Sequence, residues 1–143
     1  ALPWLGATLK EAMRLYPPIA ALMTRRTTRP ISLGGHTLPA RALVRVTPWV
    51  MHRDARFFPE PGAFRPERFM PDAEPPPRGA YVPFGLGPRV CLGQHFAVLE
   101  MTLIAAMLLQ RYRIAATDAP MPEPRLNVTL RPSTPVQLRL HRR

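Results

Sequence analysis

Proline is the feature that most limits what this chain can fold into. Twenty of the 143 residues are proline, and they gather between Pro59 and Pro88 and again from Pro120 to Pro135. Because proline breaks the interior of both helices and sheets, so many prolines mark irregular connections, and we expect much of the chain to be ordered coil. The chain is also 46% hydrophobic and 20% charged, which is typical of one globular domain and argues against a disordered tail.

Two apolar segments show the spacing of helices. In Pro3 to Leu15 apolar side chains recur every three or four residues, a proline suits the first turn, and Pro17-Pro18 ends the element. A second stripe, from Phe96 to Leu108, predicts a long and mostly buried helix that runs to about Tyr112.

Short β-prone runs predict the small sheets. Three runs separated by Gly34-Gly35 and Pro39 indicate a small antiparallel sheet: Ile31–Leu33, Thr37–Leu38 and Leu43–Pro48. Near the C-terminus, residues 126–130 and 136–140 alternate between apolar and polar and predict a two-stranded hairpin that turns at 132–135. The predicted fold class is therefore mainly α with small antiparallel β-sheets.

The single cysteine, Cys91, lies in a glycine-rich loop directly ahead of the second apolar segment. A sulfur there lies near the positive end of a helix dipole, near loop N–H groups and beside Arg89, and all three favour the charged thiolate. A thiolate binds metal, and Gly87 and Gly93 let the backbone turn sharply and approach a flat ligand closely. One cysteine excludes an internal disulfide, and the four histidines show no spacing typical of a zinc site.

Five residues of this loop resemble the heme-binding loop of the cytochrome P450 superfamily. The family's pattern of Phe, two residues, Gly, one, Arg, one, Cys, one, Gly is matched by Phe84, Gly87, Arg89, Cys91 and Gly93. At residue frequencies of about 1 in 20, five matches coincide by chance on the order of once in a few million placements. The resemblance implies heme b (iron protoporphyrin IX) as the cofactor. Cys91 would be its axial iron ligand, Arg89 would pair with a propionate, and Phe84 would pack beside the ring.

Charged residues elsewhere extend the resemblance. Glu11 and Arg14 stand three residues apart on one helical face, where they can form an ion pair. By the resemblance, Arg68 of the segment 64–69 joins them in a structural triad that locks the loop beneath the heme. Arg25, nine residues before Gly34, corresponds to an arginine that reaches a heme propionate in the family. A solvent-facing arginine is the alternative for Arg25.

Two further segments carry weaker expectations. The turn that begins at His52 resembles a His-Arg-Asp turn of the family, and we expect His52 to be a packed or capped side chain and not a metal ligand. In the family the turn of the last hairpin lines the substrate pocket. Residues near Ser133 therefore either touch substrate or form an exposed turn.

The net charge of +11 indicates an acidic partner. Nucleic acid is not predicted, because the arginines are scattered and no aromatic-basic repeat or zinc-finger spacing occurs. Under the resemblance, the partner is a ferredoxin or flavoprotein reductase that passes on electrons from NAD(P)H. No run in this chain reaches the roughly 18 apolar residues of a membrane segment. Arginine-rich, lysine-poor usage suggests a bacterial, cytoplasmic protein, and an anchoring helix in a preceding segment stays open.

The resemblance implies a heme-thiolate monooxygenase that inserts one oxygen atom of O2 into a small hydrophobic organic substrate. Members of the family are several hundred residues long. We therefore expect residues 1–143 to be the C-terminal heme-binding part of a single domain, without the N-terminal part that includes the distal oxygen-activation helix. The full-length protein would be the enzyme, and this chain alone would be inactive. The alternative is a non-catalytic remnant with weak or no heme binding.

Overall fold

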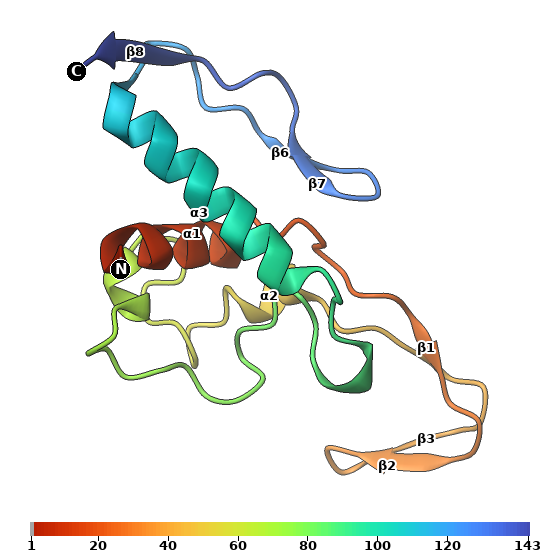
Figure 1. Ribbon diagram of the computed structural model, residues 1–143. Coiled ribbons are helices and arrows are strands. Elements are labelled where there is room, and N and C mark those ends of the chain that lie inside the picture. Colours follow the sequence, from red (N-terminus) through yellow and green to blue (C-terminus); the bar gives the residue numbers. More distant parts are fainter. Residues whose placement is uncertain (1) are drawn as a thin grey trace.

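The computed structural model describes residues 2–143 (Figure 1). Its helices are α1 (Pro3–Leu15), α2 (Pro48–Met51) and α3 (Gln94–Arg111), with short 3-10 turns η1 (Pro66–Phe69) and η2 (Gly87–Arg89). The strands are β1 (Arg25–Arg26), β2 (Ile31–Leu33), β3 (His36–Leu38), β4 (Leu43–Val44), β5 (Tyr112–Ala116), β6 (Pro124–Leu126), β7 (Leu130–Pro132) and β8 (Leu138–Arg142). They pair in four two-stranded antiparallel ladders, β1 with β4, β2 with β3, β5 with β8 and β6 with β7.

Helix α1 has the bounds that its apolar spacing predicts. Pro3 occupies a first-turn position, where its missing N–H is not needed. The Tyr16 N–H donates to the Ala12 carbonyl at 2.7 Å and closes the last turn, after which Pro17 stops the helix. The buried residues of α1 are Ala7, Glu11, Met13, Arg14 and Leu15.

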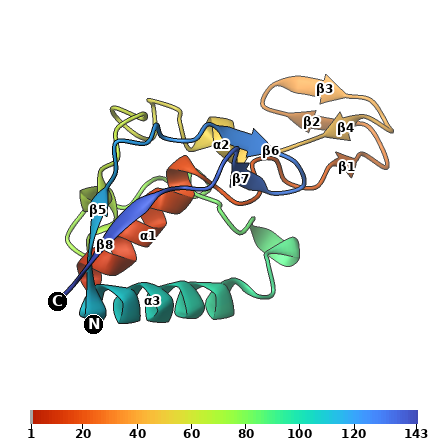
Figure 2. The same ribbon diagram turned by 90° about the horizontal axis from the view of Figure 1, so that it is seen from above.

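The core lies on one side of α1. Coil from residues 52–82 covers this side, and its buried residues are His52, Phe58, Ala80 and Val82. Helix α3 lies on the other side of α1, so that α1 stands between α3 and the coil (Figure 2). The proline-rich region 59–88 is thus ordered coil, as its composition predicts, and it is packed against a helix.

Helix α3 does not match the expected burial. The prediction of a mostly buried helix is wrong, because none of its residues is buried, and Phe96, Leu103 and Met107 are 71%, 53% and 55% exposed. Apolar side chains surround α3 on all sides, whereas within residues 2–143 it packs mainly against α1 and β5. A helix that is apolar all round is typical of the interior of a larger protein.

The first predicted sheet is two ladders. Strands β2 and β3 form a hairpin whose turn residues, Gly34 and Gly35, have φ of 57° and 80°, as a two-residue hairpin turn requires. The third β-prone run pairs elsewhere, because β4 lies against β1. Its predicted end at Pro48 is also wrong: Pro48 begins α2, since proline suits a first helical position and cannot donate to a ladder.

The predicted C-terminal hairpin is wrong in its pairing. Residues 124–126 pair with 130–132 around a turn at 127–129, and β8 pairs with β5 directly after α3. The backbone becomes extended at Tyr112, with φ −134° and ψ 146°, which ends the helix and begins β5. Alternation of apolar and polar residues identifies strands but leaves their partners open, so the pattern misassigned this pair.

Candidate functional site

A completely buried ion pair lies at the centre of the fold. Glu11 Oε2 accepts a hydrogen bond from Arg14 Nε at 2.7 Å, and Glu11 Oε1 accepts another from Arg14 Nη2 at 2.8 Å. Both side chains have no exposed surface. The bidentate geometry is the arrangement in which a carboxylate and a guanidinium satisfy one another best away from water.

The remaining donors of Arg14 bind the coil that covers α1. Its Nη1 donates to the carbonyl oxygens of His52 and Pro61 at 2.7 and 2.8 Å, and its Nη2 donates to that of Ala63 at 3.0 Å. Since these carbonyls come from a segment without regular structure, Arg14 provides hydrogen bonds that a helix or sheet would otherwise supply. The ion pair thereby fixes the 52–63 coil on α1.

Arg68 lies beside this pair, but its contact with Glu11 is longer than that of Arg14. Its Nε lies 3.5 Å from Glu11 Oε1 without a hydrogen bond, while its Nη2 donates to the Glu60 carbonyl at 3.0 Å. Burial lowers the pKa of the Arg68 guanidinium, and the neighbouring Glu11 carboxylate opposes this effect. The structure thus brings the three predicted charges together.

The third hydrogen bond to Glu11 comes from a group that sequence reasoning missed. The backbone N–H of Arg65 donates to Glu11 Oε1 at 2.8 Å. A backbone amide carries no sequence signal, because every residue except proline has one. The only indication in the sequence is the segment 64–69, which contains both Arg65 and Arg68.

Arg53 holds the C-terminal end of α1, a role that the sequence did not predict. Its guanidinium lies 3.5 Å from the centroid of the Trp49 ring, and its Nη2 donates to the Leu15 carbonyl at 2.5 Å. Burial lowers the pKa of Arg53, with the charge of Arg14 as the next contribution. Arg53 thus compensates a free carbonyl in the last turn of α1.

The Cys91 loop closes on itself through backbone hydrogen bonds. The Cys91 N–H donates to the Phe84 carbonyl at 2.9 Å, and the Cys91 carbonyl accepts from the Gln94 N–H at 3.3 Å at the start of α3. The cysteine is free and exposed, and Phe84 is partly buried. The loop therefore presents Cys91 to the surface just ahead of the helix.

The glycines of the loop differ in what they do. Gly85 and Gly87 have φ of 79° and 75°, in the left-handed region that glycine adopts without strain. Gly93 has φ −84° and ψ 7°, which other residues also adopt, so the expectation that its backbone conformation needs glycine is wrong. Gly85, whose role as a turn residue was not predicted, takes that place. The close approach of a flat ligand at Gly93 stays a prediction.

The residues around Cys91 fit a heme. Within residues 2–143 no three His, Cys, Asp or Glu side chains gather into a cluster that could hold a bare metal ion. One exposed thiol suits an iron that is already held by a macrocycle and needs a single protein ligand. Leu92 is 100% exposed and Leu86 and Phe96 are 59% and 71% exposed, so apolar side chains flank the cysteine in the sequence, as an apolar ligand requires.

The two predicted propionate ligands are both exposed. Arg89 ends η2 and stands two residues before Cys91. Arg25 lies on β1, opposite Val44. The chain just before β1 lies close to the Cys91 loop: Leu22 Cδ1 is 4.0 Å from the place that a Cβ would occupy at Gly85. The structure therefore places the entry to β1 beside the loop.

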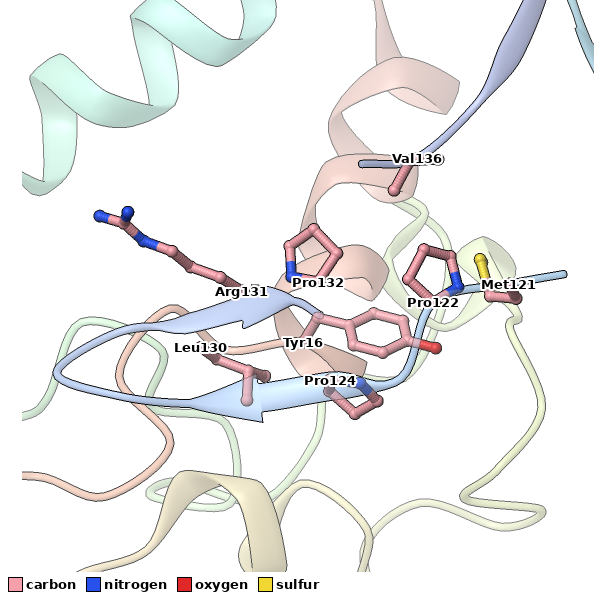
Figure 3. A pocket seen from close by; sticks show the side chains of 8 residues that line it. All are labelled: Tyr16, Met121, Pro122, Pro124, Leu130, Arg131, Pro132 and Val136. Carbon is pink, nitrogen blue, oxygen red and sulfur yellow. The ribbon is translucent and has the colours of Figure 1, made fainter. Parts of the chain in front are cut away.

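A small pocket lies between the end of α1 and the β6–β7 hairpin (Figure 3). It has a volume of about 180 Å³. The Leu130 N–H donates to the carbonyl of Pro18, in the coil just after α1, at 2.8 Å and holds the hairpin there. None of the predicted heme ligands lines it, and Ser133 does not line it either. Ser133 is exposed, and its N–H donates to the Glu123 carbonyl, which extends the hairpin. The lining residues are Tyr16, Met121, Pro122, Pro124, Leu130, Arg131, Pro132 and Val136.

Comparison with known proteins decides the family. The family model described as Cytochrome P450 matches residues 1–140. This chain belongs to the cytochrome P450 family. Cytochrome P450 members bind heme b and are heme-thiolate oxidoreductases, so the predicted family and the predicted cofactor are confirmed at the family level.

Individual P450 relatives match nearly the whole chain. It is 39% identical over 143 residues to probable cytochrome P450 4d20 of Drosophila melanogaster. This match covers 99% of this chain and 28% of that protein. It is 42% identical over 125 residues to cyclooctatin synthase of Streptomyces melanosporofaciens, covering 85% of this chain and 27% of that protein. The chain thus spans little more than a quarter of the length of these curated relatives.

Solved P450 structures share the fold. The structure of retinoic acid bound cyanobacterial CYP120A1 matches with a TM-score of 0.89 and 35% identity, over 98% of this chain and 32% of that one. CYP175A1 from Thermus thermophilus matches with a TM-score of 0.84 and 40% identity, over 98% of this chain and 35% of that one. The predicted fold class, a C-terminal portion of the P450 fold that is mainly α with small antiparallel sheets, is confirmed.

One further finding concerns membranes. In the part of the chain that the structure describes, no helix combines the length and the apolar character that crossing a bilayer requires.

Proposed function

We propose that Cys91 supplies the thiolate ligand of a heme b iron and that residues 1–143 are the C-terminal heme-binding part of a single P450 domain. The observation that carries this proposal is the exposed cysteine in a closed glycine loop ahead of an apolar helix. The full-length protein would be a monooxygenase that inserts one oxygen atom of O2 into a small hydrophobic organic substrate. The N-terminal part, with the distal oxygen-activation helix, would lie outside these residues.

Each loop residue has a proposed part in holding the heme. Arg89, two residues from Cys91, would pair with one propionate, and Arg25 would pair with a propionate from the entry to β1. Phe84 would pack beside the ring, and its carbonyl already fixes the Cys91 backbone. Gly87 would supply the sharp turn, and Gly93 the room for close approach of the ring.

The buried charges would set the rigidity of this site. Bound through a thiolate, heme supplies the activation of O2 that the family uses. Glu11 and Arg14 hold the 52–63 coil, and we propose that with Arg68 they keep the layer beneath the loop from moving when the heme binds. Ligands that are held in place before binding lose less conformational freedom on binding.

The basic surface supports a particular electron donor. The net charge of +11 favours an acidic ferredoxin or flavoprotein reductase, which would deliver electrons from NAD(P)H. Lys10 is the only lysine among the 20 basic Lys and Arg residues, and this arginine-rich usage supports a bacterial, cytoplasmic protein.

A second candidate function is a non-catalytic remnant that binds heme weakly or not at all. The exposure of α3 favours it for this chain by itself, because Phe96 and Leu103 lie uncovered just beyond the loop. An exposed apolar helix weakens the support that the loop receives from its following element. The two candidates differ in heme affinity and not in the identity of the ligand.

Titration of the apo chain with hemin tests both candidates. We expect one heme per chain, with affinity at least about tenfold lower in Cys91→Ser, since even indirect ligand supports contribute about that much. His95→Ala is the matched control, because His95 lies four residues after Cys91 and is the histidine nearest to it in the sequence. Equal uptake by wild type and Cys91→Ser would contradict the ligand role. No saturable uptake by wild type would favour the remnant.

A further inference from the structure

His52 connects α1 to the segment that leads into the Cys91 loop. It is completely buried, and its Nδ1 lies 3.3 Å from the Arg14 carbonyl oxygen. Its Nε2 lies 2.9 Å from the Val82 nitrogen, whose N–H donates to it. Because a backbone N–H can only donate, Nε2 is the unprotonated nitrogen and the ring proton stays on Nδ1, where it faces the Arg14 carbonyl. The contacts thus specify one neutral tautomer.

The side chains around the ring hold it in this orientation. The Tyr81 ring lies 5.2 Å from the His52 ring, centroid to centroid, and the Phe58 ring meets it edge-on at 6.4 Å. The Tyr81 hydroxyl in turn donates to the Lys10 carbonyl on α1 at 2.9 Å. Two adjacent residues are therefore held near α1: Tyr81 by its hydrogen bond to Lys10, and Val82 by its hydrogen bond to His52.

The backbone then passes this constraint to the cysteine. The Val82 carbonyl accepts from the Gly85 N–H at 3.1 Å, which fixes the first turn of the loop. The Phe84 carbonyl accepts from the Cys91 N–H at 2.9 Å, which fixes its end. Hydrogen bonds joined by short stretches of backbone thus connect Arg14 through His52 and Val82 to the Cys91 loop.

We propose that His52 is a positioning residue for this loop: its neutral imidazole fixes the Val82 backbone on α1 and thereby sets where the loop presents Cys91. The link between Val82 and α1 is made by protein groups only and does not depend on heme. Its consequence for heme rests on the ligand role of Cys91 proposed above. His52 would never touch the heme, and it would act through Val82.

Protonation of His52 would break this link. An imidazolium carries a proton on Nε2, which would face the Val82 N–H donor and leave both without an acceptor. The positive charges of Arg14 on α1 and of Arg53 in the same turn as His52 disfavour the imidazolium. The Glu11 carboxylate has the opposite sign but is paired with Arg14, and the neighbouring Tyr81 hydroxyl is neutral. Burial is the largest cause that lowers the pKa of His52 from 6.5 to about 4. In the folded chain the link is therefore intact at neutral pH and is lost as the pH falls through about 4.

Two substitutions of similar size separate the acceptor from the packing. His52→Gln can place an amide oxygen near the position of Nε2 and accept from Val82, whereas His52→Leu fills the space without an acceptor. In heme-free, 15N-labelled chain we expect hydrogen exchange of the Val82 amide to be roughly ten- to a hundredfold faster in His52→Leu, as loss of a buried hydrogen bond implies. In His52→Gln we expect it to stay near the wild-type rate. Equal exchange rates in the two variants would overturn the proposal.

The pH dependence adds a measurement that needs no substitution to fold. Wild-type imidazole 15N shifts should report the Nδ1–H tautomer at pH 7, and Val82 protection should fall as the pH drops through about 4. The His52→Gln variant should keep its protection through this range, and the control Tyr81→Phe, which removes only the bond to Lys10, should keep the wild-type pH profile. The opposite tautomer, or a pH profile unchanged by His52→Gln, would overturn the proposal.

The loop itself can be followed with and without heme. At pH 7 in the heme-free chain, the rate of Cys91 alkylation by iodoacetamide should differ between His52→Leu and wild type, while His52→Gln should stay near the wild-type rate. Hemin affinity of His52→Leu should be lower than that of His52→Gln. If wild type takes up no heme, the proposed function fails, while the exchange of the Val82 amide still decides the role of His52.

Discussion

Glu11 accepts two hydrogen bonds from Arg14, one turn further along α1, and neither side chain has any exposed surface. The pair lies against coil and the short turn η1, so it connects α1 to a segment that has little regular structure. A proline-rich segment lacks many backbone donors, and Arg14 supplies donors in their place. The stability of the region beneath the Cys91 loop is therefore expected to depend on this pair.

Removal of the carboxylate should unfold the region. Glu11→Gln leaves the Arg14 charge buried and unpaired, and we expect the free energy of unfolding to fall by about 3–5 kcal/mol. The matched control is Glu60→Gln, which removes the partner of Arg65 in an exposed pair and should change stability by less than about 1 kcal/mol. Urea denaturation followed by circular dichroism measures both. Similar losses in the two variants would show that the buried pair is not the stabilising contact.

Arg68 should matter less than Arg14. Arg68 makes one hydrogen bond, to the Glu60 carbonyl, and its Nε only approaches Glu11 at 3.5 Å. We expect Arg68→Leu to lower the free energy of unfolding by roughly 1.5–3 kcal/mol, the range for one hydrogen bond to a charged group. Arg14→Leu should lower it by about 3–5 kcal/mol. If the two substitutions had the same effect in urea denaturation, the three charges would form a triad of equal partners.

Stability should also fall in mild acid. The pKa of His52 is lowered from 6.5 to about 4 in the folded chain, so the unfolded state binds a proton first. This stabilisation is complete above pH 6.5 and is lost as the pH falls through 4. Hydrogen bonds from Arg56 lower the pKa of Asp54 from 3.8 to about 2, so its contribution is lost only below pH 3.8. The urea midpoint should therefore drop between pH 6.5 and 4, and a midpoint that is constant over this range in wild type would contradict the burial of a neutral His52.

The two loop glycines should respond differently to alanine. Gly87→Ala forces a side chain into φ 75° and should cost about 1–2 kcal/mol in the heme-free chain. Gly93 has φ −84° and no atom within 4 Å of an added Cβ, so Gly93→Ala should change stability by less than about 1 kcal/mol. Thermal denaturation of the two variants measures this difference. Hemin affinity is the second measurement: a loss in Gly93→Ala without a loss of stability would support close approach of the ring at Gly93.

The sequence predicted the parts of the fold that depend on local signals. Helix α1 follows from apolar spacing and flanking prolines, the β2–β3 turn from Gly34-Gly35, and the loop from its spacing of glycine, arginine and cysteine. These signals act within a few residues, so they need no knowledge of distant partners.

The parts that were missed depend on contacts between distant residues. Strand β8 pairs with β5 and not with residues 126–130, because a β-prone pattern does not name its partner. The backbone N–H of Arg65 and the Nε2 of His52 gave no signal as hydrogen-bonding groups in the sequence. The apolar stripe of α3 predicted burial, but residues 2–143 cover this helix mainly on the side toward α1.

The role of Cys91 as the axial heme ligand can be tested with the optical spectrum of the heme-loaded chain after reduction and exposure to carbon monoxide. A thiolate ligand from Cys91 predicts a strongly red-shifted Soret band that disappears in Cys91→Ser and persists in His95→Ala. A heme-loaded chain whose Soret band lacks this shift, or whose shifted band survives in Cys91→Ser, would show that Cys91 is not the axial ligand.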